Sequence, residues 1–396
     1  MSHYTYKFRL YPNQDQRIRL AKHFGCCRFV YNYFLDRRNK IYRENKKGST
    51  YCKDCEALTE LKQQEQFEWL NDANAQSLQQ ELKNLDTAFC RFFKKKAKFP
   101  KFHSKHKDKQ SFRVPQEVVV ENSRIYIRKF KEGIKLEQHR QMEGIIKHAT
   151  ISMNRAGQYF ACICVERDIK KLKKVKTEVG IDLGIKNLVT CNNGKIFKNI
   201  KPYRTLERRL KRLHRFLSKK QKGSNNRERA RVKLARLYNR ISNIRSNHLH
   251  QITRRIVNDN QVIVVEDLNV TGMSRNHKLA KSVQDVSLGE LAHQLEYKSN
   301  WYGRTFLKVS RWYPSSKTCG GCGYINDNLT LSDREWTCPR CSAKLDRDLN
   351  AAKNILLEGK RTVGTTGLAC GESVRLPQRS NSRRNTKPTS SRRRGD

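Results

Sequence analysis

Two matched cysteine pairs near the C-terminal end constrain the fold of this chain more than any other feature. Cys319 and Cys322 form one C-x2-C pair, Cys338 and Cys341 form another, and 15 residues separate the pairs. The two residues inside each pair let a tight turn direct both sulfur atoms at one ion, and this spacing is typical of a four-thiolate zinc ribbon. We therefore predict a ribbon over residues 315–344 whose four cysteines hold a structural Zn²⁺ ion.

Two acids follow the ribbon directly, where a helix is predicted to begin. Asp346 and Asp348 precede apolar residues at helical spacing: Leu349, Ala351, Ala352, Ile355 and Leu356. An aspartate at a helix N-terminus caps the helix and complements its dipole. Capping explains one acid better than two, so any chemical role depends on whether other carboxylates join them.

The charge of the chain points to a polyanionic partner. Lys and Arg number 84 against 37 Asp and Glu, which gives a net charge of +47 over 396 residues. A chain of this length holds two or three compact units, and nucleic acid is the leading partner. A peripheral membrane protein would instead concentrate its basic residues on an amphipathic helix or beside an apolar span.

The sequence shows no sign of a membrane partner or of secretion. No run approaches the roughly 18 apolar residues that cross a bilayer, and the starting segment MSHYTYKFRL lacks the apolar core of a secretory signal. We therefore expect a cytoplasmic protein. The odd number of cysteines, 13, disfavours a disulfide framework. Cys52 and Cys55 form an isolated C-x2-C, which we interpret as a loop feature without a metal.

The N-terminal half combines strands with a helical segment. Residues 4–10 alternate between apolar and polar and end at Pro12-Asn13, as a half-buried strand does. Helical spacing follows up to about Phe93. Further short strands are expected at 112–120, 124–127, 149–153 and 159–165, with a hairpin turn at 155–157. This pattern predicts a small β-barrel made of residues 1–12 and 95–170, interrupted by a helical domain at 13–94.

The second half contains two buried strands that carry acids. Residues 179–189 show strand-like alternation around Asp182, and residues 261–268 form an apolar strand that ends in Glu266 and Asp267. A carboxylate inside an apolar strand is costly unless it is paired or bound to a cation. We therefore interpret Asp182 and Glu266 as ligands, and Asp267 as the start of a loop.

The remaining segments of this half are helical or polar. Residues 203–259 are predicted to form a basic helical hairpin that breaks at 223–226. A helix at 288–302 and a strand at 305–309 precede the ribbon. The tail, residues 363–396, is rich in Ser, Arg and Asn with few apolar residues, so we expect it to be disordered.

Three acids distant in sequence, Asp182, Glu266 and Asp348, can meet only through the fold. A strand hairpin, a buried strand and a final helix that carry them suggest a mixed α/β sheet of the RNase H type. The segments that hold them, VGIDLGIKNLV, VVEDLNV and DRDLNAAKNI, together with PSSKTCGGCG and WTCPRC, resemble the transposon-encoded TnpB (OrfB) family, compact relatives of type V CRISPR nucleases. The resemblance extends to YKFRLYPN, FGCCRFVYNYFL and FPKFHSK and so covers most of the chain.

The resemblance implies an RNA-guided DNA endonuclease of multidomain α/β architecture. A RuvC-like nuclease domain would comprise residues 177–314 and 345–362, with the barrel as a wedge-like domain and the helical insertion as a recognition domain. Asp182, Glu266 and Asp348 would be the catalytic residues, with Asp346 as a supporting acid. The implied partners are a guide RNA from the transposon end and double-stranded target DNA beside a short motif, in the prokaryotic cytosol.

Phosphodiester cleavage suits these acids, because two hard cations about 4 Å apart can hold the attacking water and the leaving oxygen. Carboxylates are the ligands that Mg²⁺ prefers, so two Mg²⁺ ions are expected. Two other functions stay open: a non-cleaving RNA-guided regulator that binds DNA, and a transposase that acts directly on the element. The intact acids argue against the first, and the ribbon joined to the DRDLNAAKNI helix argues against the second.

Overall fold

The structure is a computed structural model that describes residues 2–106, 108–330, 332–366 and 373–375. It divides into two compact units, Met1–Ile169 with Glu207–Arg240, and Lys170–Leu206 with Ile241–Asp396. The division groups most of the basic helical hairpin with the N-terminal residues, whereas the sequence placed the whole hairpin in the nuclease domain. The other domain boundaries stay predictions. No helix among the described residues is both long and apolar enough to span a bilayer.

The first unit is built on a seven-stranded antiparallel sheet in the order β2-β6-β7-β1-β5-β4-β3. Strand β1 (Ser2–Tyr11) lies in the middle, where it pairs with β7 and β5. The other strands are β2 (Gln110–Val114), β3 (Val119–Glu121), β4 (Arg124–Ile127), β5 (Phe130–Glu137), β6 (Ile145–Met153) and β7 (Tyr159–Arg167). None of the described pairs joins β2 to β3, so closure into a barrel stays a prediction.

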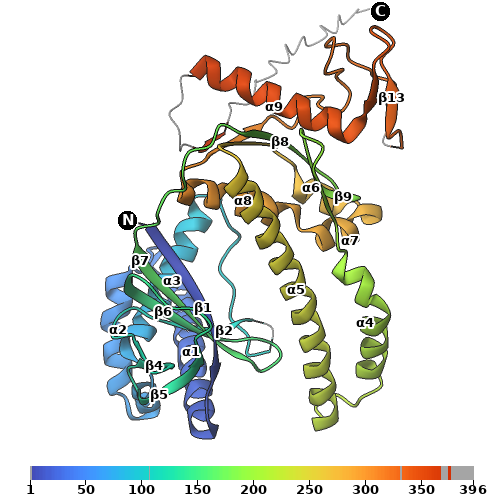
Figure 1. Ribbon diagram of the computed structural model, residues 1–396. Coiled ribbons are helices and arrows are strands. Elements are labelled where there is room, and N and C mark those ends of the chain that lie inside the picture. The colour runs from blue at the N-terminus through green and yellow to red at the C-terminus, as the bar shows by residue number, and fades with distance from the viewer. Residues whose placement is uncertain (1, 107, 331, 367–372, 376–396) are drawn as a thin grey trace, which may run out of the picture. The chain divides into compact units, whose positions relative to one another are not determined.

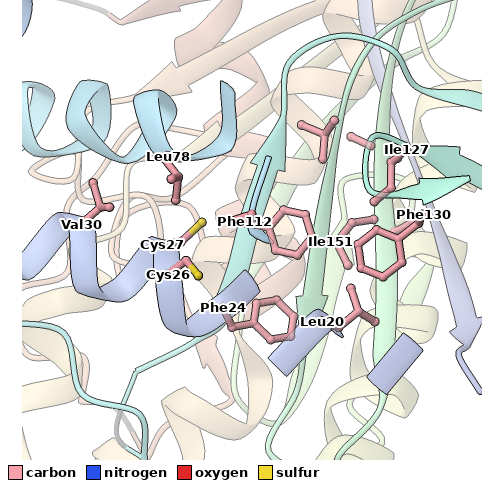
Figure 2. Close-up of a cluster of buried hydrophobic side chains, with 14 of the residues drawn as sticks. Leu20, Phe24, Cys26, Cys27, Val30, Leu78, Phe112, Ile127, Phe130 and Ile151 are labelled. Carbon is pink, nitrogen blue, oxygen red and sulfur yellow. The ribbon is translucent and has the colours of Figure 1, made fainter. Parts of the chain in front are cut away.

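Helices between β1 and β2 pack on this sheet. They are α1 (Gln14–Asn45), α2 (Tyr51–Gln63), the 3-10 helix η1 (Glu65–Asp72) and α3 (Ala75–Phe93). Helix α1 begins after Pro12 because Asn13 accepts a hydrogen bond from the Gln16 amide at 2.8 Å. Figure 2 shows Leu20 and Phe24 of α1 pointing toward Phe112, Phe130 and Ile151 of the sheet.

In this unit two sequence predictions were wrong and one strand was missed. The strand expected at 112–120 is two strands, β2 and β3, because Pro115 lacks the amide that a continuous ladder needs. Strand β5 was missed, since its alternating side chains include several charges and Gly133 at a φ of +68°. Cys52 and Cys55 lie on helix α2, not in a loop.

The second unit contains a mixed six-stranded sheet in the order β10-β9-β8-β11-β12-β15. Strands β8 (Glu178–Leu183), β9 (Asn187–Cys191) and β10 (Ile196–Lys198) form an antiparallel meander. Strands β11 (Val262–Glu266), β12 (Thr305–Val309) and β15 (Ser373–Arg375) continue it in parallel with β8. The sequence predicted a single strand over 179–189, but the chain turns at Gly184 and forms two.

Helices cover both faces of this sheet. On one face, Leu249 and Ile252 of α5 (Asn225–Asp259) and Leu291 of α8 (Leu288–Tyr302) pack against the strands. On the other, α9 (Arg347–Thr366) lies across β8, as Figure 1 shows, and Ile355 packs against Val264. Shorter or connecting helices are α4 (Pro202–Ser218), α6 (Val270–Arg275) and α7 (His277–Val286).

The C-terminal region departs from the predicted tail at two places. Helix α9 continues to Thr366, and β15 pairs with β12 through Ser373, so the tail expected from residue 363 is ordered at both points. The rest of the predicted tail, residues 367–372 and 376–396, lies outside the described residues. The ribbon itself contains a short antiparallel pair, β13 (Glu335–Thr337) and β14 (Lys344–Asp346).

Candidate acid site and four-cysteine centre

Strand alternation directs Asp182 and Glu266 to the sheet face that α9 covers. In β8, Val179, Ile181 and Leu183 belong to the core on the opposite face, so Gly180 and Asp182 point toward α9. In β11, Val264 contacts Ile355 of α9, and Glu266 follows two residues later on the same face. Because Ile181 lies opposite Val265 in parallel register, the next residues along, Asp182 and Glu266, are neighbours at the strand ends.

Gly180 allows α9 to approach β8 closely enough to bring its first turn to these acids. A Cβ atom at this position would overlap the Ala352 carbonyl oxygen and lie 2.7 Å from Leu356 Cβ. No side chain fits there without displacing the helix. Gly180 was not among the residues predicted from sequence, although a glycine inside an apolar strand is a signal of close backbone approach.

The two acids at the start of α9 have different roles. Asp346 caps the helix, because its Oδ1 accepts a hydrogen bond from the Leu349 amide at 2.7 Å. Asp348 lies in the first turn and is partly buried, with Arg334 Nη1 at 3.4 Å and Arg347 Nη2 at 3.7 Å from its Oδ1. Capping therefore accounts for Asp346 and leaves Asp348 available to the acid site.

Asp182 lies within electrostatic reach of both Asp348 and Glu266. Burial, followed by the charge of Asp348, raises the pKa of Asp182 to about 6. Burial, followed by the charge of Asp182, raises the pKa of Glu266 to about 7, against a hydrogen bond from Ser315 that favours the ionised form. Carboxyl groups buried beside other acids in this way attract a cation, which would offset their repulsion.

The three carboxyl groups are nevertheless spaced more widely than a closed metal site. Among the described residues, one group of at least three Asp, Glu, His or Cys side chains has all its ligand atoms within 4.8 Å of one another, and that group is Cys319, Cys322, Cys338 and Cys341. The fold thus places the predicted acids near the same strand ends, but they do not form a ligand group as compact as the four cysteines.

The four cysteines have the geometry of a thiolate metal site. Cys319 Sγ lies 3.6 Å from Cys341 Sγ, and Cys322 Sγ lies 3.5 Å from Cys338 Sγ. Four sulfurs bound tetrahedrally to Zn²⁺ at about 2.3 Å would lie about 3.8 Å apart. The donor set and the spacing therefore both fit Zn²⁺.

Tight backbone turns set the cysteine positions. In the first, the Gly323 amide donates to the Cys319 carbonyl at 2.9 Å; in the second, the Ser342 amide donates to the Cys338 carbonyl at 2.8 Å. Gly323 and Ser342 both have positive φ, +74° and +59°. Although burial opposes ionisation, backbone amides of Cys341 and Arg340 lower the pKa of the Cys338 thiol to about 7, which favours a thiolate ligand.

Two asparagines of α9, Asn350 and Asn354, fasten the ribbon to the helix that carries Asp348. Asn350 accepts from the Gly320 amide at 3.0 Å and donates to the Thr318 carbonyl at 2.7 Å. Asn354 donates to the carbonyls of Ser315 and Thr318 at 2.8 and 2.6 Å. Both side chains are buried. Neither asparagine was predicted from sequence, although two polar residues four apart on a buried helix face are a signal of specific hydrogen bonding.

Comparison with protein families gives three matches along the chain. A family described as "Probable transposase" matches residues 162–277, and one described as "Cas12f1-like, TNB domain" matches 289–355, which includes the four cysteines. A third, "Helix-turn-helix domain", matches residues 1–47. The described part of that last segment contains strand β1 and the whole of the single long helix α1.

Similar proteins extend over nearly the whole chain. A protein of Streptomyces pristinaespiralis named "Putative RNA-guided DNA endonuclease" is 39% identical over 382 residues, 96% of this chain and 93% of that protein. InsQ of Escherichia coli K12, with the same description, is 34% identical over 388 residues, 93% of this chain and 94% of that protein.

A solved structure is similar in fold. The Cas12f1 chain in a cryo-EM structure of a Cas12f1–sgRNA–target DNA complex matches with a TM-score of 0.54 at 16% sequence identity. The match covers 87% of this chain and 82% of that one. At this identity the likeness concerns the fold alone.

Proposed function

This chain belongs to the TnpB (OrfB) family, and from that premise we propose that it is an RNA-guided DNA endonuclease encoded by a transposable element. The observation that carries the proposal is the set of partly buried acids, Asp182, Glu266 and Asp348, at one edge of the second sheet. The relative from Streptomyces, 39% identical over nearly its full length, is named for this activity.

The strand order supports a RuvC-like nuclease domain of the RNase H type. An antiparallel meander, β10-β9-β8, is followed in the same sheet by parallel strands β11 and β12, with helices on both faces. Asp182 in β8, Glu266 at the end of β11 and Asp348 at the start of α9 occupy neighbouring ends of three elements. This arrangement allows residues remote in sequence to serve one reaction centre.

We assign Asp182, Glu266 and Asp348 as ligands of Mg²⁺, and we expect a pair of ions. Bound divalent cations would activate a water molecule and stabilise the charge that develops on the scissile phosphodiester. Neighbouring side chains hold the acids in position, because the Ser315 hydroxyl donates to Glu266 while Arg334 and Arg347 fix Asp348.

The four cysteines serve a structural role in this proposal. Four thiolates complete the coordination of Zn²⁺ and leave no position for water. The ion would therefore stabilise the fold of the ribbon and take no part in DNA cleavage. The hydrogen bonds of Asn350 and Asn354 to the ribbon would then fix the position of the first turns of α9.

The net charge of +47 supports binding to two nucleic acids, a guide RNA from the transposon end and double-stranded target DNA. Pairing of the guide with one DNA strand would supply sequence specificity, while the protein would grip backbone phosphates and recognise a short motif beside the target. Phosphate contacts release counterions, so affinity for both should fall steeply as salt concentration rises.

The test begins with the RNA that copurifies with the protein. One defined species, sequenced and used to choose a matching DNA target, should direct Mg²⁺-dependent cutting. Asp182→Ala, Glu266→Ala and Asp348→Ala should abolish cutting and leave guide and target binding nearly intact. Asp259→Asn, an exposed acid that pairs with Lys195, is the matched control and should cut normally.

Three outcomes would overturn the proposal or a part of it. Copurification of random RNA, with no guided cutting, would contradict the function. Guided binding without cutting by the unaltered chain would indicate a non-cleaving regulator. Full cutting by any one alanine variant would remove that residue from the site.

A further inference from the structure

Trp312 is the most exposed of the large apolar side chains described, at 81%. Single exposed apolar residues are common on protein surfaces, so exposure by itself says little. What distinguishes Trp312 is its position in the loop that follows β12. Glu266 lies opposite Val309, the last residue of β12, and Trp312 follows three residues later at the same edge of the sheet.

The backbone around Trp312 is fixed by hydrogen bonds. The Tyr313 amide donates to the Ser310 carbonyl at 3.0 Å, and the Trp312 amide donates to Ser310 Oγ at 3.3 Å. The Ser315 amide donates to the Tyr313 carbonyl at 2.8 Å. The turn therefore presents the indole from a defined position while leaving the ring in solvent.

Residues on both sides of Trp312 contact Glu266 or its neighbour Asp267. Arg311 pairs with Asp267, the residue after Glu266, and the Asp267 amide donates to the Val309 carbonyl at 2.9 Å. On the other side, the Ser315 hydroxyl donates to Glu266 itself. Trp312 thus lies in sequence between Arg311 and Ser315, which contact Asp267 and Glu266, although its exposed ring contributes little to the core.

We propose that Trp312 stacks on an unpaired base of the DNA strand that enters the acid site. This assignment rests on the endonuclease function proposed above and names a substrate contact for it. An aromatic ring recognises the π face of a base, and only an unpaired base exposes that face, since a base inside a duplex is stacked on both of its neighbours. A stacked base beside Glu266 would hold the adjoining phosphodiester against the acids.

The expected loss on removing the ring follows from stacking. Alanine substitution of a stacking aromatic weakens binding of the base by about 1–3 kcal/mol, which corresponds to about fivefold to 150-fold. Because guide pairing supplies most of the target affinity, this loss should appear in the cutting rate of the bound complex. Overall target affinity should change little.

The experiment uses the full chain loaded with its guide, in the Asp182→Ala background so that the DNA stays intact. The fluorescent base 2-aminopurine is placed at successive positions of each DNA strand around the cut site, and in the guide as a separate series. We expect one or two adjacent DNA positions to be quenched with Trp312 present, unquenched in Trp312→Ala and partly quenched in Trp312→Phe.

Cutting is measured in parallel with Asp182 intact. Trp312→Ala should slow cutting of the bound target about fivefold to 150-fold, and Trp312→Phe should recover most of the rate. The melting temperature should not change, because the exposed ring removes little packing when it is truncated. Tyr324→Ala, which truncates an exposed aromatic of the ribbon, should cut normally.

Each alternative result overturns the assignment. Normal cutting and unchanged quenching in Trp312→Ala would exclude stacking while leaving the endonuclease function standing. Quenching confined to the guide series would show that the ring binds RNA. A lowered melting temperature with no position-specific quenching would show a structural role. Failure of the unaltered chain to cut would instead count against the proposed function.

Discussion

Replacing Glu266 by Gln should remove activity and at the same time stabilise the free protein at alkaline pH. The substitution keeps the size of the side chain and an oxygen that can accept from Ser315, but it removes the charge. The folded state raises the pKa of Glu266 from 4.5 to about 7, mainly because burial disfavours the charged form. The stabilising effect of this raised pKa is complete below pH 4.5 and is lost as pH rises through 7.

The magnitude follows from the pKa. A rise of about 2.5 pH units corresponds to about 3 kcal/mol at 1.36 kcal/mol per unit. Because the carboxyl is only partly buried, we expect about 1–2 kcal/mol for Glu266→Gln at pH 8 without Mg²⁺. This gain would raise the apparent melting temperature of a unit of this size by about 2–8 °C.

The assay is thermal and denaturant unfolding of the zinc-loaded protein at pH 5 and pH 8, with and without Mg²⁺. The advantage of Gln should largely disappear at pH 5, where the native carboxyl is already protonated. It should reverse in saturating Mg²⁺, because ligand at 100 times its Kd stabilises the protein that binds it by about 2.7 kcal/mol. Two results would refute the inference that the Glu266 carboxyl is desolvated beside Asp182. One is a Gln variant that is less stable than the unaltered protein at pH 8 without Mg²⁺; the other is a stability difference between the two proteins that does not depend on pH.

Three further predictions concern the supports of the site. Gly180→Ala should cost about 1–3 kcal/mol of stability and suppress cutting, because the new Cβ meets α9; a normal melting temperature and cutting rate would contradict this. Asn354→Leu should cost about 2 kcal/mol, since the Ser315 carbonyl loses its side-chain donor and the Thr318 carbonyl keeps only Asn350, while metal analysis still finds zinc; loss of zinc would show instead that the ribbon had unfolded. Cys338→Ser should lower bound zinc and cutting together, and full zinc retention would exclude this cysteine as a ligand.

The features of the site that could be predicted from sequence are those encoded locally. The cysteine spacing specified the ribbon because two turns of known geometry suffice to form it. Asp182 and Glu266 stood out because a charge at the end of an apolar strand is conspicuous within a few residues. That these acids would meet Asp348 required either the fold or the resemblance to a known family.

Features that depend on packing between distant segments could not be predicted from sequence. The role of Gly180 is visible only once α9 is known to cross β8, and that of Asn350 only once the ribbon is known to rest on α9. Strand β5 was missed because its charges obscure the alternation, although β1 and β4 complete its ladder. In each case the deciding partner lies far away in sequence.

The most direct test is the anomalous scattering of Mn²⁺ in crystals of the complex with guide RNA and uncleaved target DNA. Peaks within about 2.2 Å of carboxylate oxygens from Asp182, Glu266 and Asp348, beside one DNA phosphate, are the predicted result. Mn²⁺ bound elsewhere on the DNA path, with any of these three carboxylates outside its coordination sphere, would contradict a shared site.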